Sequence, residues 1–176
     1  MKNFDLRKYL AENKLFEAAM ACPTATQNLE LNTKNRDAAI KAEYIQYGPL
    51  NVDEPGDYWK DIAEYWNTTE EAAKKSLCGN CVAFDISPRM DECMPGQVSD
   101  KGDFNKISQE LFDKDYNSLS SDEQAEVLSK SDRLGYCWMH HFKCHSARSC
   151  RTWAKGGPIT KDSISYDWQE RNKDKV

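Results

Sequence analysis

Seven cysteines are the residues of this 176-residue chain whose type and spacing could do chemistry. Six of them fall in one stretch of the sequence: Cys78, Cys81, Cys93, Cys137, Cys144 and Cys150. Cys78 and Cys81 form a C-x2-C pair, in which a tight turn can bring two thiolates to one metal. Cysteine makes up about 4 per cent of the chain, well below the content of small disulfide scaffolds. The pattern therefore favours metal ligation over a disulfide framework.

The compartment predicted from the sequence is a reducing one. The first residues, MKNFDLRKYLAENKLF, are charged throughout and resemble neither a secretory signal nor a transit peptide. No segment has the ~20 consecutive apolar residues of a membrane span. We therefore expect a cytoplasmic protein without a membrane partner, in which clustered cysteines serve more often as ligands or redox groups than as disulfides.

Nucleic-acid binding is not expected. The net charge is −5 with a pI of about 5.3, and charges of both signs are interspersed. A protein that replaces the counterions of a nucleic acid needs a basic stripe. The one locally basic run, residues 140 to 151, is short and is typical of a solvated loop.

The surroundings of the cysteines resemble a known family. Cys93 is followed by Met94-Pro95-Gly96. Cys137 follows Gly135-Tyr136 and precedes the aromatic residue Trp138. Together with the C-x2-C pair, these segments resemble the high-potential iron-sulfur proteins, over residues 77 to 96 and 135 to 143. The resemblance implies one 4Fe-4S cluster, with Cys78, Cys81, Cys93 and Cys137 as its ligands, in a carrier of single electrons. It implies no catalysis and no catalytic residue, and an unidentified redox protein as partner.

A second resemblance covers the style of the whole chain. The segments DLRKYLAENKL and SCRTWAKGGPI are similar to those of uncharacterised proteins of marine tailed phages. This resemblance implies a viral origin, a location in the host cytoplasm or the virion, and virion proteins as alternative partners. A cluster in such a protein could be purely structural.

Aromatic residues near the candidate ligands are expected to shield a cluster from water. Burial and hydrogen bonds to sulfur tune the potential and stability of such clusters. The shielding residues we expect are Phe84, Tyr136, Trp138, Phe142 and Trp153. His140 and His141 follow the Cys137 segment directly, so one of them could also hydrogen-bond to a sulfur.

Several alternatives stay open. Zinc could replace the cluster as a four-thiolate site, or with His140, His141 or His145 as one ligand, in a zinc-stapled interaction module. Cys144 and Cys150 are assigned to a disulfide, to alternative ligand positions or to simple packing. Cys22 is expected to be a buried thiol.

The elements that must position these residues are predicted to be mostly helices. Apolar spacing and capping residues predict helices over 3–19, 34–47, 57–66 and 104–113. Two capping boxes, Thr68 with Glu71 and Ser120 with Glu123, predict helices that begin just after them. Residues 159–176 are predicted to form a polar, frayed tail, with only Tyr166 and Trp168 docked.

We expect one domain of mainly α class with few or short strands. Leu, Ile, Val and Phe make up only 29 of 176 residues, so a metal would add cohesion to a thin core. We divide the domain into a helical part, 1–76, a cysteine-rich cluster-binding part, 77–158, and the tail. The cysteine-rich part is irregular around the cluster and carries a helical insertion over about 97–134.

Overall fold

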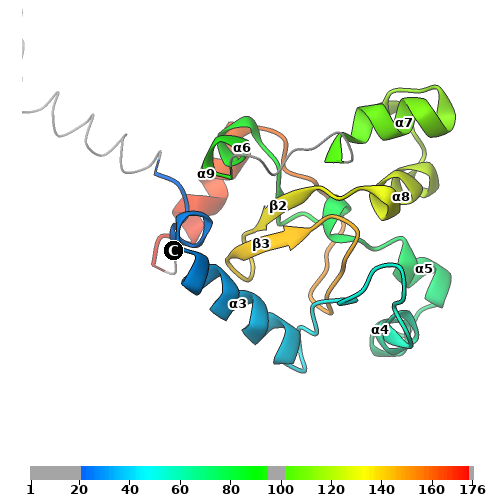
Figure 1. Cartoon of the computed structure of the whole chain (residues 1–176), viewed down its shortest axis with the longest axis horizontal. Coiled ribbons are helices and arrows are strands. Elements are labelled where there is room, and N and C mark those ends of the chain that lie inside the picture. Colours follow the sequence, from blue (N-terminus) through cyan, green and yellow to red (C-terminus); the bar gives the residue numbers. More distant parts are fainter. Residues whose placement is uncertain (1–20, 95–101, 175–176) are drawn as a thin grey trace, which may run out of the picture.

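A small antiparallel sheet lies at the centre of the molecule, and helices surround it (Figure 1). This computed structural model describes residues 21–94 and 102–174. Its helices are α2 (Thr24–Gln27), α3 (Leu29–Lys41), α4 (Tyr58–Trp66), α5 (Glu70–Lys74), α6 (Pro88–Cys93), α7 (Phe104–Phe112), α8 (Ser121–Lys130) and α9 (Asp162–Arg171). Its strands are β1 (Phe84–Asp85), β2 (Leu134–Cys137) and β3 (Phe142–His145). The mainly α class with few, short strands is thus confirmed.

The sheet has the order β1-β2-β3 and places cysteines on neighbouring strands. Cys137 pairs with Phe142 across the β2–β3 hairpin, and Gly135 pairs with Cys144. A Cβ atom at Gly135 would lie 2.6 Å from the ring of Phe84 on β1. The absence of a side chain at Gly135 therefore lets the buried ring pack directly onto the hairpin.

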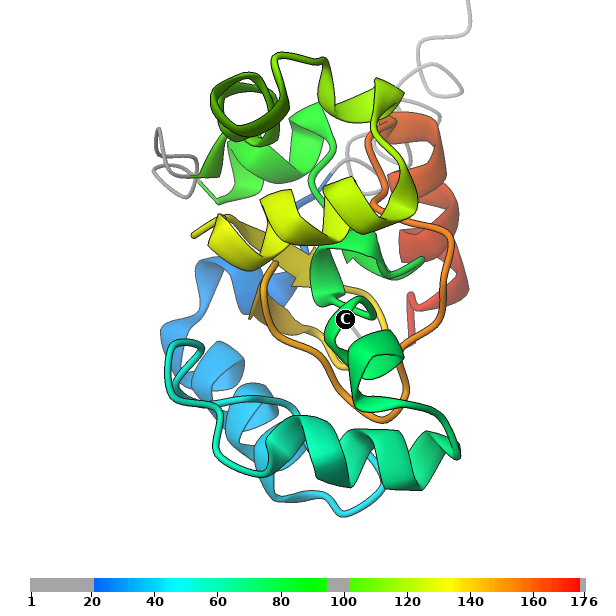
Figure 2. The ribbon, with the colours of Figure 1, turned by 90° about the vertical axis from the view of Figure 1, so that its right-hand side faces the viewer.

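Two groups of apolar side chains form the core. One surrounds the sheet and includes the rings of Phe84, Tyr136, Trp138 and Phe142. The other lies among α4, α5, α7 and α8 and includes Trp59, Ile62, Ile107 and Leu128. These four helices lie along one side of the molecule, beside the sheet, with α7 at the top and α4 at the bottom in both views (Figures 1 and 2).

Three helices occur where local signals predict them. α4 and α7 match the predicted ranges closely. α8 begins with the predicted capping box: the Ser120 amide donates to Glu123 Oε2 at 2.8 Å, and the Glu123 amide donates to Ser120 Oγ at 3.4 Å. These signals lie within a few residues of the helices they specify.

The predicted boundaries of two helices are wrong. α3 begins at Leu29 rather than near 34, because the Asn28 side chain caps it by accepting from the Leu31 amide. It ends at Lys41, because the amides of Ile45 and Gln46 both turn back to the Ala42 carbonyl well before Gly48. The cap of α5 is Thr69 and not Thr68, since Thr69 Oγ1 accepts from the Ala72 amide.

The predicted frayed tail is also wrong, because residues 162–171 form α9. Arg89 of α6 anchors this helix by donating to Ser165 Oγ at 2.8 Å and by stacking over the Tyr166 ring at 4.3 Å. Ser165 in turn donates to the buried carboxylate of Asp85. The helix is stabilised by partners far away in sequence, which local composition does not reveal.

Some expectations fall on other parts of the chain. The predicted helix over 3–19 and the loop after Met94 lie outside the described residues. Within residues 21–94 and 102–174, no helix combines the length and apolar character needed to cross a bilayer.

Candidate functional site

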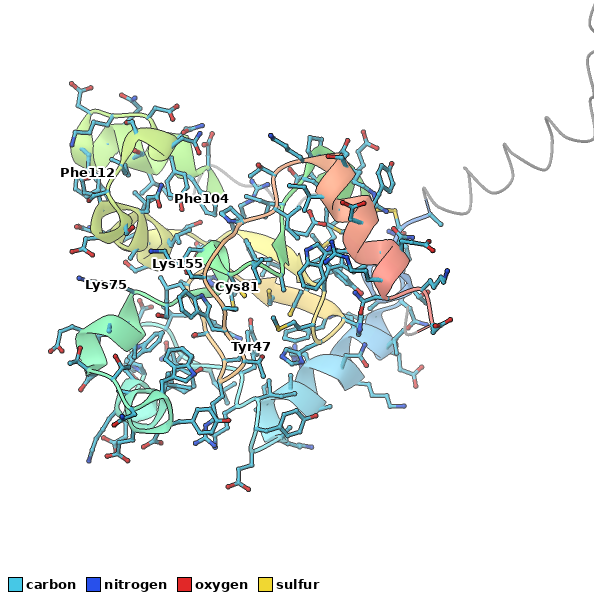
Figure 3. The ribbon with its side chains drawn as sticks, turned by 180° about the vertical axis from the view of Figure 1, so that it is seen from behind. Tyr47, Lys75, Cys81, Phe104, Phe112 and Lys155 are labelled. Carbon is cyan, nitrogen blue, oxygen red and sulfur yellow. A yellow bond between two sulfur atoms is a disulfide. The ribbon has the colours of Figure 1, made fainter. Side chains whose placement is uncertain are left out.

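Five free cysteines gather inside the molecule, and we call them the thiol cluster: Cys78, Cys81, Cys137, Cys144 and Cys150. The Cys144 thiol hydrogen-bonds with those of Cys78 and Cys137. The thiols of Cys81 and Cys150 each interact electrostatically with Cys78 and Cys137. Cys81 lies near the centre of the molecule (Figure 3). The thiol cluster thus contains three of the four predicted ligands, together with both cysteines of open assignment, Cys144 and Cys150.

The first segment of the thiol cluster is the tight turn Cys78–Asn80, which continues to Cys81. The Asn80 side chain closes the turn, since its Oδ1 accepts from the Leu77 amide at 3.0 Å and its Nδ2 donates to the Lys75 carbonyl at 2.8 Å. A Cβ at Gly79 would lie 2.5 Å from Leu128 Cδ2. A side chain at this position would therefore displace Leu128 of α8, against which the turn packs.

The second segment is the loop of residues 146–157, which carries Cys150. The amides of Cys78 and Gly79 donate to the carbonyls of Arg148 and Ser146, at 2.6 and 2.9 Å. A Cβ at Gly157 would lie only 1.7 Å from the Cys81 carbonyl oxygen. The loop is thus held directly against the C-x2-C turn.

The third segment is the β2–β3 hairpin, which carries Cys137 and Cys144. Four residues separate the strands in sequence, and His141 adopts a left-handed conformation with φ of 54°. This conformation turns the chain back, so that the His141 amide donates to the Cys137 carbonyl at 2.8 Å. The hairpin presents its two cysteines to the turn and the loop.

Backbone amides hydrogen-bond to three of the five sulfurs. The Cys81 sulfur accepts from the amides of Ala83 and Ala154. Amides of residues 139 and 140 hydrogen-bond to the Cys137 sulfur, and the amide of Thr152 hydrogen-bonds to the Cys150 sulfur. Amide donors stabilise negative charge on sulfur, and metal-bound thiolates commonly have them. The amides therefore place partial positive charge beside the sulfurs of Cys81, Cys137 and Cys150.

Burial determines the protonation of the thiol cluster in the absence of a cation. Desolvation raises the pKa of Cys81 to about 12 and raises those of Cys144 and Cys150 as well. The pKa of Cys137 is lowered, chiefly because Cys144 donates a hydrogen bond to its sulfur. A bound metal would supply the positive charge that buried thiolates need.

The five aromatic residues expected to shield a cluster pack in the same core group as the thiol cluster. Phe84, Tyr136, Trp138 and Phe142 are buried, and the Tyr136 and Trp138 rings meet edge to face at 4.9 Å between centroids. Trp153 is half-buried and covers the C-x2-C turn, where its Nε1 donates to the Leu77 carbonyl at 2.9 Å. Such rings keep water away from buried sulfur.

Tyr47 is another aromatic residue of this core group, which sequence reasoning missed. Its hydroxyl accepts from the His145 amide at 2.8 Å, and its ring meets Phe142 at 4.8 Å. Burial raises its pKa well above the ordinary value, and neighbouring Cys144 and Cys78 add to the effect. No local signal marks Tyr47, because paired bonds between Gly48 and Ser149 bring its segment to the site.

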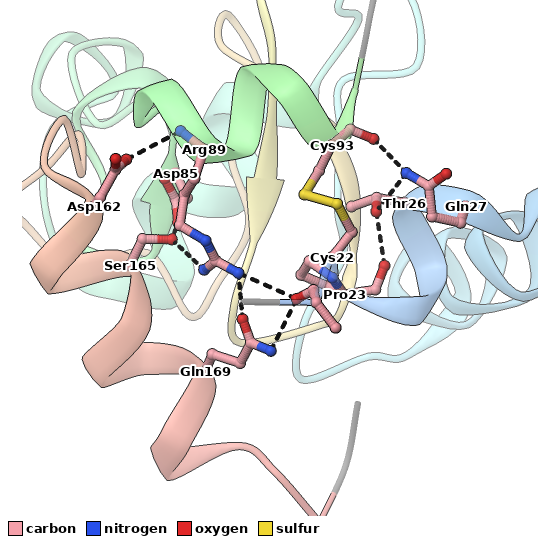
Figure 4. The surroundings of a disulfide bond; sticks show 11 residues. Cys22, Pro23, Thr26, Gln27, Asp85, Arg89, Cys93, Asp162, Ser165 and Gln169 are labelled. Atoms are coloured by element: carbon pink, nitrogen blue, oxygen red, sulfur yellow. Dashed lines mark hydrogen bonds between the residues drawn. A yellow bond between two sulfur atoms is a disulfide. The ribbon is translucent and has the colours of Figure 1, made fainter. Parts of the chain in front are cut away.

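Cys93 does not lie in the thiol cluster, and the expectation that Cys22 is a free thiol is wrong. These two residues form a disulfide with 5.5 Å between their Cα atoms (Figure 4). A sulfur in a disulfide is not a thiolate, so Cys93 cannot ligate a metal in this state. Cys144 and Cys150 are both free thiols, and a disulfide between them is not formed.

Side chains around the disulfide explain why Cys22 meets Cys93. Gln27 Nε2 donates to the Cys93 carbonyl at 2.7 Å, which fixes the end of α6 beside α2. Arg89 and Gln169 both donate to the Ala21 carbonyl, at 3.2 and 3.0 Å (Figure 4). Three helices therefore hold the two cysteines together.

Two histidines have ring partners other than sulfur: His140 bonds with Thr152, and His145 Nδ1 accepts from the Ala147 amide. His140 Nε2 lies 2.7 Å from Thr152 Oγ1. Burial, together with the neighbouring His141, lowers the pKa of His140 to about 4. His140 is therefore neutral at pH 7.

Within residues 21–94 and 102–174, no group of three or more His, Cys, Asp or Glu side chains is arranged as a preformed site for a metal ion. Comparison of the chain with protein-family models, with curated proteins and with solved structures finds no match.

Proposed function

We propose that this protein binds one 4Fe-4S cluster in the thiol cluster and carries single electrons. The observation that supports the proposal is the convergence of five free thiols from three chain segments, three of them with amide donors to sulfur. Four thiolates are the usual complement of such a cluster.

The ligands that we propose are Cys78, Cys81, Cys137 and Cys150. Cys81, Cys137 and Cys150 have the amide donors, and Cys78 shares the turn with Cys81. Cys150 replaces Cys93 in this set, because the disulfide removes Cys93. Cys144 is the remaining thiol, which donates its hydrogen bond to a neighbouring sulfur.

A bound 4Fe-4S cluster supplies reversible one-electron chemistry. The chain would contribute three things of its own. Buried rings exclude water, amides stabilise charge on sulfur, and the half-buried Trp153 packs against the C-x2-C turn. Trp153 lines a pocket of about 320 Å³, so a redox partner could approach the turn on this side.

Anaerobic purification followed by iron, sulfide and zinc analysis tests the proposal. We expect about four irons and four sulfides per chain, and a brown protein. Cys137→Ser and Cys150→Ser should lose iron, whereas the double variant Cys22→Ser/Cys93→Ser should retain it as a matched control. Zinc without sulfide would instead make the protein a zinc-stapled module, and a metal-free protein would contradict both functions.

A structural role is the second candidate. The C-x2-C turn lies more than fifty residues before the hairpin and the loop that follows it, so any bound metal group would cross-link these distant parts of the chain. In a phage protein, such a cross-link could serve assembly without electron transfer. Redox titration separates the two functions: a reversible paramagnetic state supports electron transfer, and a cluster inert to oxidation and reduction supports the structural role.

A further inference from the structure

A chain of three side chains runs from the hairpin to the thiol cluster. His140 Nε2 lies 2.7 Å from Thr152 Oγ1, and Thr152 Oγ1 lies 3.2 Å from Cys150 Sγ. Both distances are those of hydrogen bonds, the second one to sulfur. The Thr152 hydroxyl thus lies between an imidazole and a proposed ligand sulfur.

The backbone fixes Thr152 on both sides. The Arg151 amide donates to the Ile45 carbonyl at 2.7 Å, and the Arg151 carbonyl accepts from Trp66 Nε1 at 2.9 Å. The Trp153 amide donates to the Cys150 carbonyl at 3.0 Å. Thr152 therefore has little freedom to turn its hydroxyl elsewhere without disturbing the loop.

The direction of the two hydrogen bonds follows from the number of protons. The Thr152 hydroxyl has one proton, and a metal-bound thiolate can only accept. If Cys150 is a thiolate, Thr152 must donate to it, and its oxygen must then accept from His140. A neutral imidazole has one N–H, so this N–H must be on Nε2.

We propose that Thr152 is a positioning residue that donates a hydrogen bond to the Cys150 sulfur, with its hydroxyl oriented by the Nε2–H tautomer of His140. The inference rests on the proposed function. Donors to a ligand sulfur stabilise the more negative, reduced cluster. Thr152 therefore raises the reduction potential of the site, and His140 acts on the sulfur only through Thr152.

The first test compares Thr152→Val with Thr152→Ser in the anaerobically purified, full-length protein. Valine keeps the shape of threonine but removes the hydroxyl, whereas serine keeps the hydroxyl. We expect all three proteins to retain iron and sulfide. The potential of Thr152→Val should shift to a more negative value, and that of Thr152→Ser should stay close to wild type. Equal potentials in all three would overturn the inference.

The second test reads the tautomer directly. In protein labelled with ¹⁵N at histidine, the imidazole nitrogen shifts of His140 should show the proton on Nε2. A proton on Nδ1 would overturn the inference, since Thr152 would then donate to His140 and not to sulfur.

The outcomes separate this inference from the function on which it rests. A wild-type protein with iron and sulfide but with equal potentials in the Thr152 series leaves the proposed function standing and rejects the role of Thr152. A wild-type protein without a cluster rejects both. Loss of iron in Thr152→Val together with Thr152→Ser also rejects the role proposed here, because it would show a need for threonine in folding of the loop.

Discussion

Removal of the Cys22–Cys93 disulfide should destabilise the protein by about 4 kcal/mol. The two cysteines are 71 residues apart in sequence, and the chain-entropy relation for a loop of that length gives about 4 kcal/mol at 25 °C. The double variant Cys22→Ser/Cys93→Ser isolates this effect. The hydrogen bonds at Ala21 and Cys93 use backbone carbonyls as acceptors, so the substitutions leave those acceptors in place.

Urea unfolding of the wild type and the double variant, both without reductant, measures the loss. The variant should unfold at a lower urea concentration than the wild type. Its unfolding free energy should also depend more steeply on urea concentration, because its denatured chain is no longer cross-linked and exposes more surface. Addition of a dithiol reductant should bring the wild type to the variant's curve, provided that the metal content stays the same. Identical unfolding free energies and slopes for the two oxidised proteins would refute this reasoning.

Three further predictions concern the loop, a helix cap and pH. Gly157→Ala should destabilise the protein by roughly 1–3 kcal/mol and reduce metal content, because a Cβ there would lie 1.7 Å from the Cys81 carbonyl oxygen; thermal unfolding and metal analysis measure both effects. Ser120→Ala should lower the free energy of unfolding, measured in urea, by about 1 kcal/mol, because it removes the α8 cap. The control Ser121→Ala, one residue into the helix, should change this free energy by less than half as much. The folded-state pKa of His140, about 4, lies below its unfolded value of roughly 6.5, so the unfolded chain binds the proton more readily between these values. The unfolding free energy should therefore be greatest above pH 6.5 and fall by at most about 3 kcal/mol as the pH drops to 4, and urea unfolding of His140→Gln over this range should show a smaller fall. An unchanged pH dependence in that variant would contradict the assignment to His140.

The parts of the fold that sequence reasoning predicted are those with local causes. Tyr58–Trp66 and Phe104–Phe112 have apolar residues at helical spacing, and Ser120 is followed by its own capping partner. α9 was missed because its stabilising partners, Arg89 and Asp85, lie more than seventy residues earlier. Local composition cannot reveal a contact of that range.

In the candidate site, too, the predictable features are those with local sequence patterns. The C-x2-C pair and the aromatic residue after Cys137 are local patterns, and the structure brings these cysteines together. The pairing of Cys22 with Cys93 depends on the packing of α2 against α6, and nothing near either cysteine signals it. Thr152 follows Cys150 by two residues, but a hydroxyl at that spacing is common in loops and indicated no role by itself.

The loop of residues 146–157 has a consequence for biosynthesis. It supplies Cys150 and covers the C-x2-C turn, and it also bonds to the segment around Gly48. A nascent chain therefore cannot close the thiol cluster until residue 157 has left the ribosome, even though Cys78 and Cys81 emerge much earlier. During that interval both thiols are exposed to solvent and to oxidants. Insertion of the cluster that we propose would then be a late event, on a chain whose elements before α9 have already been made.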